Sequence, residues 1–302
     1  MVFGGVPIQE NEKMFKDPAQ TPHIVIGTPG RVLALVKKNV MKLDNLEMFV
    51  LDECDKMLDE SDMREQVQKI FMRGNANRQV MMFSATMPKM IADLASEYLT
   101  DPVRVEVSQA GKIADKVTHA VHFVTKDEKK SLLISLLNEN KTNRSLVFAR
   151  TKHGAERLMR QLEEAGFNAA SIHGNKSQGQ RDRAISNFRD GSVKILVATD
   201  VAARGIDVPG IEQVFNYDLP NVPENYVHRI GRTGRCGKTG VATTFINKNV
   251  EETILLDLKH LLLEAKHAYC ARDHLGERKL SIQAELSAQR RGLLVQGRLH
   301  AA

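Results

Sequence analysis

Short apolar runs that alternate with helical patterns constrain the fold of this chain more than any other feature of its sequence. In residues 1–107 the runs are too short for helices and match strands at residues 23–26, 48–51, 80–83 and 103–107. Residues 31–37 and 87–98, between these runs, have helical periodicity. Strands that alternate with helices build parallel sheets, so this half of the chain is predicted to be an α/β domain.

Residues 118–265 repeat this pattern more completely. The strand candidates there are residues 120–124, 145–148, 169–172, 194–198, 213–216 and 242–246. Helical periodicity marks residues 129–137, 153–165 and 251–265. We therefore predict two α/β domains with mostly parallel sheets, residues 1–107 and 118–265, joined by a linker at residues 108–117 that lacks apolar periodicity.

The composition is that of an ordinary globular chain, and its basic charge is concentrated at one end. The 302 residues are 42% hydrophobic and 26% charged, which predicts about two domains. Of the net charge of +6, residues 266–302 contribute +4, from seven basic and three acidic side chains. We expect these residues to form a mobile basic tail. Because the rest of the chain carries little net charge, nucleic-acid binding has to be argued from local patches.

Cysteine usage and hydropathy favour a reducing compartment. Cys54, Cys236 and Cys270 lie far apart, without the spacing of a metal site or a disulfide framework. No apolar run approaches the length of a membrane span, and Met1 is not followed by a charged and then apolar leader. We expect the protein in the cytoplasm or the nucleus.

The acidic stretch Asp52-Glu53-Cys54-Asp55 directly follows the predicted strand at residues 48–51. Ligands bind at the carboxyl ends of strands in open α/β sheets. Neighbouring carboxylates repel each other unless a cation lies between them and the ligand, and Mg²⁺ is commonly held by one or two carboxylates and the phosphates of a nucleotide. The stretch therefore indicates a Mg²⁺-nucleotide site, and the alternative is a solvated acidic turn.

Three other short segments of the first half are candidate binding loops. Thr28-Pro29-Gly30-Arg31 opens a helix, where backbone amides and Arg31 suit a phosphate, although a plain turn and helix start explain it too. Gly4-Gly5, after a possible strand at Val2-Phe3, permits close approach of a phosphate chain. Ser84-Ala85-Thr86 ends a strand and suits a relay of hydrogen bonds; the alternative is a helix N-cap at Thr86.

The second half contains two more specific motifs. Thr199 to Asp207, with Arg204 and Gly205 in its centre, follows the strand at residues 194–198 and suits a loop that contacts phosphate and ribose. Residues 228–235 hold His228 and several arginines, which pack at a high cost unless anions compensate them. On a helix Arg232 and Arg235 share one face and suit a triphosphate; a solvated basic face is the alternative.

Gly237-Lys238-Thr239 is not a phosphate-binding P-loop. That loop requires G-x-x-x-x-G-K-[ST], and Arg232 occupies the position of its first glycine.

On these motifs the chain resembles the DEAD-box RNA helicases of superfamily 2, over residues 2 to about 265. The resemblance implies RecA-like domains, ATP and Mg²⁺ as cofactors, and RNA bound through its backbone. It makes Asp52 and Glu53 the metal-side and water-positioning carboxylates, and Arg232 and Arg235 arginine fingers. The resemblance also implies a coupling role for Asp55, Ser84, Thr86 and His228. It implies ATP binding by Gly205, Asp207, Arg232 and Arg235. The implied RNA-binding residues are Gly4, Gly5, Pro29, Gly30, Arg31, Arg150, Thr151, Gly174, Gln178, Arg181 and Thr199.

The resemblance is not uniform along the chain. Cys54 replaces the usual alanine, as in DECD-type helicases of mRNA export and splicing, which residues 2–72 resemble most. Residues 78–235 resemble bacterial helicases of the RhlE type, and residues 241–266 the abstrakt-type spliceosomal helicases. The family's Q motif and P-loop are expected before Val2, so we expect an incomplete first domain. The implied activity is ATP-dependent RNA unwinding; the alternatives are a catalytically inactive RNA- or partner-binding module and a DNA helicase.

Overall fold

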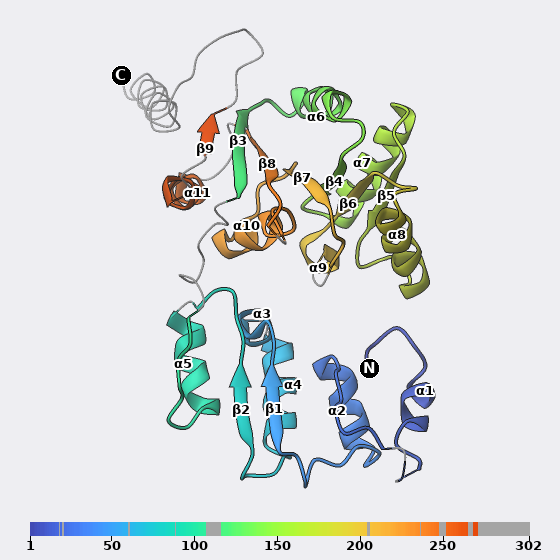
Figure 1. Cartoon of the computed structure of the whole chain (residues 1–302), viewed down its shortest axis with the longest axis vertical. Helices are drawn as coiled ribbons and strands as arrows, with labels where there is room; N and C mark the ends of the chain where they lie inside the picture. Colours follow the sequence, from blue (N-terminus) through green and yellow to red (C-terminus); the bar gives the residue numbers. More distant parts are fainter. Residues whose placement is uncertain are drawn as a thin grey trace, which may run out of the picture. The chain divides into compact units, whose positions relative to one another are not determined.

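The computed structural model describes residues 1–17, 19, 21–59, 61–87, 89–106, 116–203, 206–235, 237–247, 252–264 and 268–270. The chain divides into two compact units, Met1–Gly111 (unit 1) and Lys112–Ala302 (unit 2). Figure 1 labels the elements of each unit.

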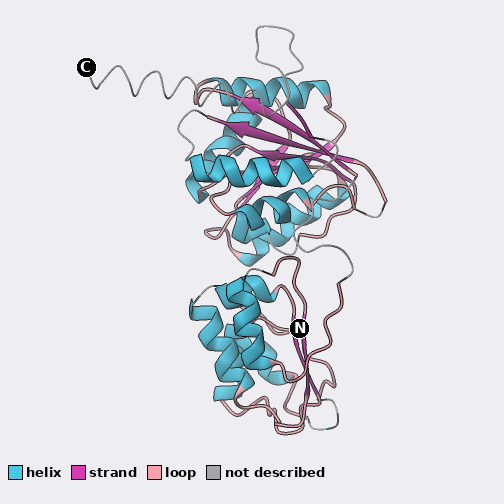
Figure 2. Cartoon of the chain, turned by 90° about the vertical axis from the view of Figure 1, so that its left-hand side faces the viewer, coloured by secondary structure: helices cyan, strands magenta, loops and turns pink. Residues whose placement is uncertain are grey.

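Unit 1 is built on two parallel strands, β1 (Met48–Leu51) and β2 (Gln79–Met82), paired in register from Met48 and Gln79. Its helices are α1 (Ile8–Lys13), α2 (Pro29–Lys37), α3 (Cys54–Asp59), α4 (Ser61–Phe71) and α5 (Lys89–Tyr98). Figure 2 shows these helices gathered on one side of the strands. Alternation along β1 explains this, since Leu51 is buried in the core while Met48 and Val50 are exposed on the other face.

The strand predictions for unit 1 were half right. Residues 48–51 and 80–83 correspond to β1 and β2, but residues 23–26 and 103–106 form no strand, and Val107 lies outside the described residues. Val2 forms only an isolated parallel bridge with Gly27. Without further described strands beside them, these apolar runs have no ladder to join: Ile24, Ile26, Val103 and Val105 are exposed. Helices α1, α3 and α4 were not predicted from the sequence.

Unit 2 contains a seven-stranded parallel sheet in the order β5-β6-β4-β7-β8-β3-β9. Its strands are β3 (Val117–Phe123), β4 (Arg144–Phe148), β5 (Ala169–Ile172), β6 (Ile195–Ala198), β7 (Ile211–Asn216), β8 (Gly240–Ile246) and β9 (Ala268–Cys270). Its helices are α6 (Glu128–Glu139), α7 (Lys152–Glu164), α8 (Gln178–Asp190), α9 (Asp200–Ala203), α10 (Pro223–Ile230) and α11 (Glu252–Glu264).

The central strands of unit 2 are buried on both faces. In β4, Val147 packs into a cluster with α6 and α7, while Leu146 and Phe148 pack into a second cluster with α8. The residues of β6 alternate between the same two clusters. Side chains of a strand alternate between faces, so two hydrophobic layers require the continuous apolar runs that the sequence contains.

The predicted strands and helices of unit 2 are all present, with small differences at their ends. The prediction missed α8 and α9, and it was wrong to leave residues 268–270 in a tail without order, because they form β9 beside β3. The rest of the predicted tail, and most of the predicted linker, lie outside the described residues. No helix in the described ranges combines the length and the apolar character needed to cross a membrane.

Candidate functional site

The acidic turn of unit 1 lies where β1 ends. Asp52 is exposed, and its Oδ1 accepts a hydrogen bond from the backbone N–H of Glu53 at 3.0 Å. Glu53 has φ +50°, a left-handed conformation that is uncommon outside glycine and asparagine and tends to occur at functional sites. This turn directs the chain from β1 into α3. It leaves the Asp52 carboxylate at the carboxyl edge of the strands, where the sequence analysis expected it.

Asp55 and Thr86 form a buried hydrogen bond that joins two predicted motifs. The Thr86 hydroxyl donates to Asp55 Oδ2 at 2.5 Å, and both residues are at most 5% exposed. The backbone N–H of Cys54 donates to the carbonyl of Phe83 at 3.0 Å, which brings the acidic turn beside Ser84. The helix N-cap interpretation of Thr86 is wrong, because α5 begins only at Lys89. Two residues that are far apart in sequence, and that the resemblance assigns to coupling, thus meet in a buried hydrogen bond.

Cys54 belongs to the core of unit 1. Its side chain is fully buried among Leu51, Leu58 and their neighbours. Burial, assisted by the neighbouring Asp55 carboxylate, raises the pKa of the thiol. A buried thiol with a raised pKa is a structural residue and not a nucleophile.

The carboxylates of Asp52 and Glu53 fit a metal ion that arrives with its phosphates. Neither forms an ion pair with another residue in the part of the chain that the structure describes. The described residues also contain no cluster of three metal-ligating side chains. Mg²⁺ retains water ligands and is held by one or two protein carboxylates together with substrate phosphates, so this pair suits Mg²⁺ better than a metal enclosed by protein.

The Gly4-Gly5 turn and the start of α2 are held together. The backbone N–H of Val2 donates to Ile26 O at 2.8 Å, and that of Thr28 donates to Val2 O at 3.0 Å. The Arg31 guanidinium donates to Asn11 Oδ1 at 2.5 Å and to Val6 O at 2.6 Å. Arg31 therefore serves within unit 1, where it fixes the segment after Gly5 against α2.

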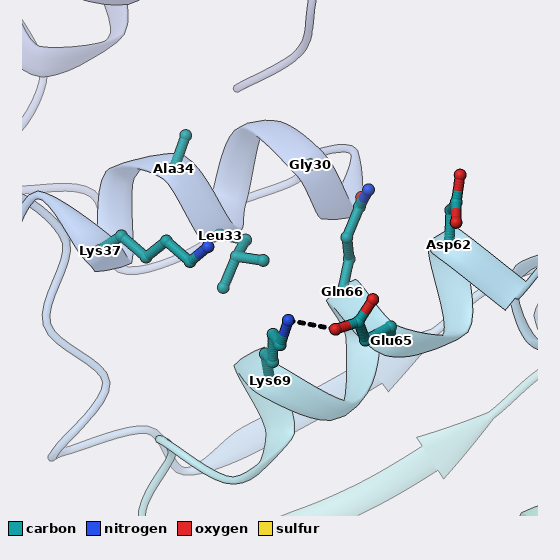
Figure 3. A pocket seen from close by; sticks show the side chains of 8 residues that line it. All are labelled: Gly30, Leu33, Ala34, Lys37, Asp62, Glu65, Gln66 and Lys69. Atoms are coloured by element: carbon teal, nitrogen blue, oxygen red, sulfur yellow. Dashed lines mark hydrogen bonds and ion pairs between the residues drawn. The ribbon is translucent and has the colours of Figure 1, made fainter.

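Pro29 and Gly30 are the first two residues of α2, with Thr28 at the N-cap position. A Cβ on Gly30 would lie 3.1 Å from the side-chain oxygen of Gln66, so glycine allows α2 to pack closely against α4. Beside Gly30 a surface groove of about 350 Å³ runs between α2 and α4 (Figure 3). The groove is lined by Gly30, Leu33, Ala34, Lys37, Asp62, Glu65, Gln66 and Lys69. Its charges are balanced, so it lacks the positive character of a phosphate site.

The arginine motif of unit 2 is not helical throughout. Helix α10 ends at Ile230, and the chain then turns, with Gly234 at φ +69°. The prediction that Arg232 and Arg235 share a helical face was therefore wrong, although both approach the loop before β7. Arg232 donates to Ile206 O at 3.1 Å, and Arg235 pairs with Asp207 at 3.0 Å. Arg204 and Gly205, the centre of the predicted loop, lie outside the described residues.

Arg229 is the residue of this motif that the sequence analysis did not single out. It is 2% exposed, forms a bidentate ion pair with Asp200 at 2.5 and 2.8 Å, and donates to Asn216 Oδ1 and Asp218 O. Its guanidinium lies 4.9 Å from the ring centre of Phe148. Asp200 and Asp207 thus supply the anions that the motif was expected to need. Asp200, an acid two residues after strand β6, was the signal available in the sequence. His228 lies beside Arg229 in the last turn of α10.

Arg150 and Thr151 lie at the start of α7, directly after β4. The Thr151 side chain caps the helix by accepting from Gly154 N at 2.9 Å. The backbone N–H of Arg150 donates to Asp218 Oδ2 at 3.0 Å, and its side chain is exposed. A helix N-terminus with an exposed arginine is a suitable place for a phosphate.

The remaining predicted RNA-binding residues follow β5 and β6. Arg181 donates to Gly174 O at 3.4 Å, and Gln178 is the first residue of α8. Thr199 is buried, and its N–H donates to Ile172 O at 3.3 Å. Because β5, β6 and β4 are neighbours in a parallel sheet, the segments after them meet at one edge. The structure therefore brings to one edge of the sheet the six RNA-binding residues predicted in unit 2: Arg150, Thr151, Gly174, Gln178, Arg181 and Thr199.

Two family profiles match this chain. That of the DEAD/DEAH box helicases matches residues 1–94, and that of the helicase conserved C-terminal domain matches residues 128–237. The chain is 46% identical over 269 residues to DEAD-box ATP-dependent RNA helicase 35A of Oryza sativa subsp. japonica. It is 41% identical over 266 residues to ATP-dependent RNA helicase abstrakt of Drosophila melanogaster. Each alignment covers 88% of this chain and 42% of the relative, so the chain spans less than half the length of these relatives.

Among solved structures, S. cerevisiae Dbp5 bound to RNA and ADP BeF3 is similar to this chain with a TM-score of 0.75 at 29% identity. The alignment covers 89% of this chain and 68% of that one. The predicted α/β architecture with RecA-like units and parallel sheets is thereby confirmed.

Proposed function

The chain belongs to the DEAD-box family of ATP-dependent RNA helicases, and from that premise we propose that its residues serve ATP-driven opening of RNA duplexes or remodelling of RNA–protein complexes. The observation that carries the proposal is the gathering of the candidate RNA residues at the carboxyl ends of β4, β5 and β6. Arg232 donates to Ile206 O and Arg235 pairs with Asp207, so both arginines contact the loop before β7, which supports a nucleotide site there as well.

In the proposed reaction the residues position ATP and water. Glu53 would orient the attacking water, and Asp52 would help to hold Mg²⁺. Mg²⁺, when bound with ATP, supplies positive charge to the phosphate oxygens. The guanidinium groups of Arg232 and Arg235 stabilise the charge that develops on the transferred phosphoryl group. Gly205 and Asp207 contact the nucleotide.

Arg235 is suited to exchange partners during such a reaction. Its ion pair with Asp207 joins side chains that are 40% and 84% exposed. Exposed ion pairs contribute only about 0–1 kcal/mol, so a triphosphate competes readily with the carboxylate. Arg229, in contrast, is itself 2% exposed and pairs with Asp200, so it is a structural residue in this proposal.

RNA is proposed to bind through its backbone. Arg150, the helix start at Thr151 and the Gly174 loop offer cationic groups and backbone amides, which recognise phosphate without reading bases. Binding should therefore tolerate different sequences and weaken steeply with salt, because neutralised phosphates release counterions. Deletion of residues 266–302 removes +4 of the net charge and should weaken binding further. Affinity that stays constant with salt and on deletion would contradict this electrostatic picture; preference for single-stranded DNA over RNA would favour the DNA helicase alternative.

The ATPase proposal is tested with a polypeptide of these 302 residues, whose sequence contains no G-x-x-x-x-G-K-[ST] motif. Backbone amides and the lysine of that motif hold the phosphates, and loss of such positioning removes on the order of 7–11 kcal/mol of catalytic advantage. We expect no measurable RNA-stimulated hydrolysis from this polypeptide. Fusion of a P-loop segment from a DEAD-box relative should produce it, and Glu53→Gln should abolish the gain.

Glu47→Gln is the matched control, since Glu47 is exposed and lies at the opposite end of β1. It should leave the activity of the fusion unchanged. Robust turnover by the 302 residues alone that Glu53→Gln eliminates would refute the requirement for a P-loop. A fusion that binds RNA but never hydrolyses ATP would favour the second candidate, an RNA- or partner-binding module. We also propose cytoplasmic or nuclear residence, from the scattered cysteines and the RNA substrate.

A further inference from the structure

One carboxylate in unit 2 joins the elements that carry the candidate RNA residues. Glu156 lies in the second turn of α7, and its Oε2 accepts a hydrogen bond from Ser171 Oγ of β5 at 2.6 Å. The same oxygen lies 3.1 Å from His173 Nε2 and 3.0 Å from Lys176 Nζ. A single side chain of α7 thus contacts a strand and both ends of the loop at residues 173–176.

The hydrogen bonds indicate which ring nitrogen of His173 carries the proton. The backbone N–H of Asn175 donates to His173 Nδ1 at 3.4 Å, so Nδ1 is an acceptor and Nε2 carries the proton that is donated to Glu156. The backbone N–H of Lys176 donates to His173 O at 3.0 Å and closes the turn. The hydrogen bond from Ser171, with those from Lys176 and His173, lowers the pKa of Glu156 to about 2 despite partial burial. The carboxylate is therefore ionised at neutral pH.

Gly174 lies inside this loop and touches the other candidate RNA elements. A Cβ at Gly174 would lie 3.0 Å from Lys152 Cε. The side chain of Lys152, the first residue of α7, therefore packs directly on Gly174. On the other side, Arg181 of α8 donates to the Gly174 carbonyl. A shift of residues 173–176 would therefore move Gly174 relative to the helix starts that flank it.

From this geometry we propose that Glu156 is a positioning residue that holds the loop at residues 173–176 in the shape that receives RNA phosphate. The proposal rests on the proposed function, since Gly174 and Arg181 are RNA residues only there. Glu156 itself is not a ligand, because a carboxylate repels phosphate. The direction of the change in RNA affinity therefore distinguishes the two effects. Removal of a negative charge near phosphate strengthens binding by electrostatics alone, whereas loss of the loop geometry weakens binding.

The test measures binding of the full chain to a labelled single-stranded oligouridylate by fluorescence anisotropy over a range of salt concentrations. Glu156→Ala should weaken binding about tenfold or more, the loss expected for one charge-assisted hydrogen bond to phosphate, and should lower the salt slope by about 1. Glu156→Gln keeps an acceptor for Ser171 and His173 but loses the ion pairs with Lys176 and with Arg160, so it should weaken binding less. It also decides the question if Glu156→Ala fails to fold.

Glu163→Gln is the matched control, because Glu163 is exposed on the same helix and its change removes the same charge. It should leave affinity unchanged or slightly raised. Equal or tighter binding by both Glu156 variants would overturn the proposal. Hydrogen exchange without RNA gives an independent readout: amides of residues 174–177 should exchange faster in Glu156→Ala, and unchanged protection would overturn the positioning role. Absence of salt-dependent RNA binding by the unmodified chain would instead refute the proposed function.

Discussion

Replacement of Arg229 by Met should destabilise unit 2 more than any other single change in the arginine motif. Arg229 is 2% exposed and donates to Asp200, Asn216 and the Asp218 carbonyl. Methionine keeps an apolar stem near Phe148 but leaves the Asp200 carboxylate without its bidentate partner. Breaking a buried ion pair in this way lowers stability by about 3–5 kcal/mol.

The lower end of that range applies, because the Asp200 side chain is 31% exposed and water can partly replace the guanidinium. We therefore expect a loss of about 3 kcal/mol, which corresponds to a fall in Tm of about 6–12 °C for a unit of this size. The chain contains no tryptophan. Unfolding is therefore best followed in the full chain by hydrogen exchange of peptides from β6 and β7, across a urea titration.

Three variants separate the ion pair from general disruption of packing. Arg229→Lys retains the charge without the planar fork and should lose less stability than Arg229→Met. Asp200→Asn combined with Arg229→Met removes both charges and should recover part of the loss. Arg157→Met changes an exposed arginine of α7 and should alter stability by no more than about 0.5 kcal/mol. If Arg229→Met changed stability by less than about 1 kcal/mol, the assignment of Arg229 as a buried structural cation would be wrong.

Three further predictions concern other parts of the chain. Thr86→Val should lower the stability of unit 1 by about 1–3 kcal/mol, because the buried Asp55 carboxylate loses a hydrogen-bond donor. Thr86→Ser keeps a hydroxyl donor and should retain most of that stability; urea unfolding of both variants measures the difference. Amides of β1 and β2 should exchange faster than those of β4 and β6, because a two-stranded sheet protects less than a seven-stranded one; equal protection would contradict this. The stability advantage of the unmodified chain over Glu156→Gln should be complete above pH 4.5 and should vanish as the pH falls through about 2. The reason is that folding lowers the pKa of the Glu156 carboxyl from 4.5 to about 2.

The sequence by itself determined the α/β class, strands β3 to β8 of unit 2 and its helices α6, α7 and α11. Continuous apolar runs such as Leu146–Phe148 and Ile195–Ala198 are readable because central parallel strands are buried on both faces. The acidic turn at Asp52 and the small residues at Ser84 were recognisable for a related reason. Each directly follows a strand, and the carboxyl ends of parallel strands meet at one edge.

Polar helices were less readable from the sequence. Helix α8 has a weakly apolar face, with Ala184 and Phe188 its only buried residues, so its hydrophobic period is faint. Its capping box, Ser177 with Gln180, was the local signal that could have revealed it. Helix α10 was misjudged at its end, because the sequence continues polar and basic past Ile230 while the chain already turns.

Only the tertiary structure decided which charged residues are buried in ion pairs and which stay exposed. Arg229, Arg232 and Arg235 look alike in sequence, yet Arg229 is buried on Asp200 while Arg235 pairs with an exposed Asp207. Arg31 binds Asn11 and Val6, and Glu156 binds Ser171 of another element. These partners lie many residues apart in the chain, so the local sequence pattern does not predict them. The electrostatic role of a charge depends on its burial and its partner, and both are fixed only when distant segments pack together.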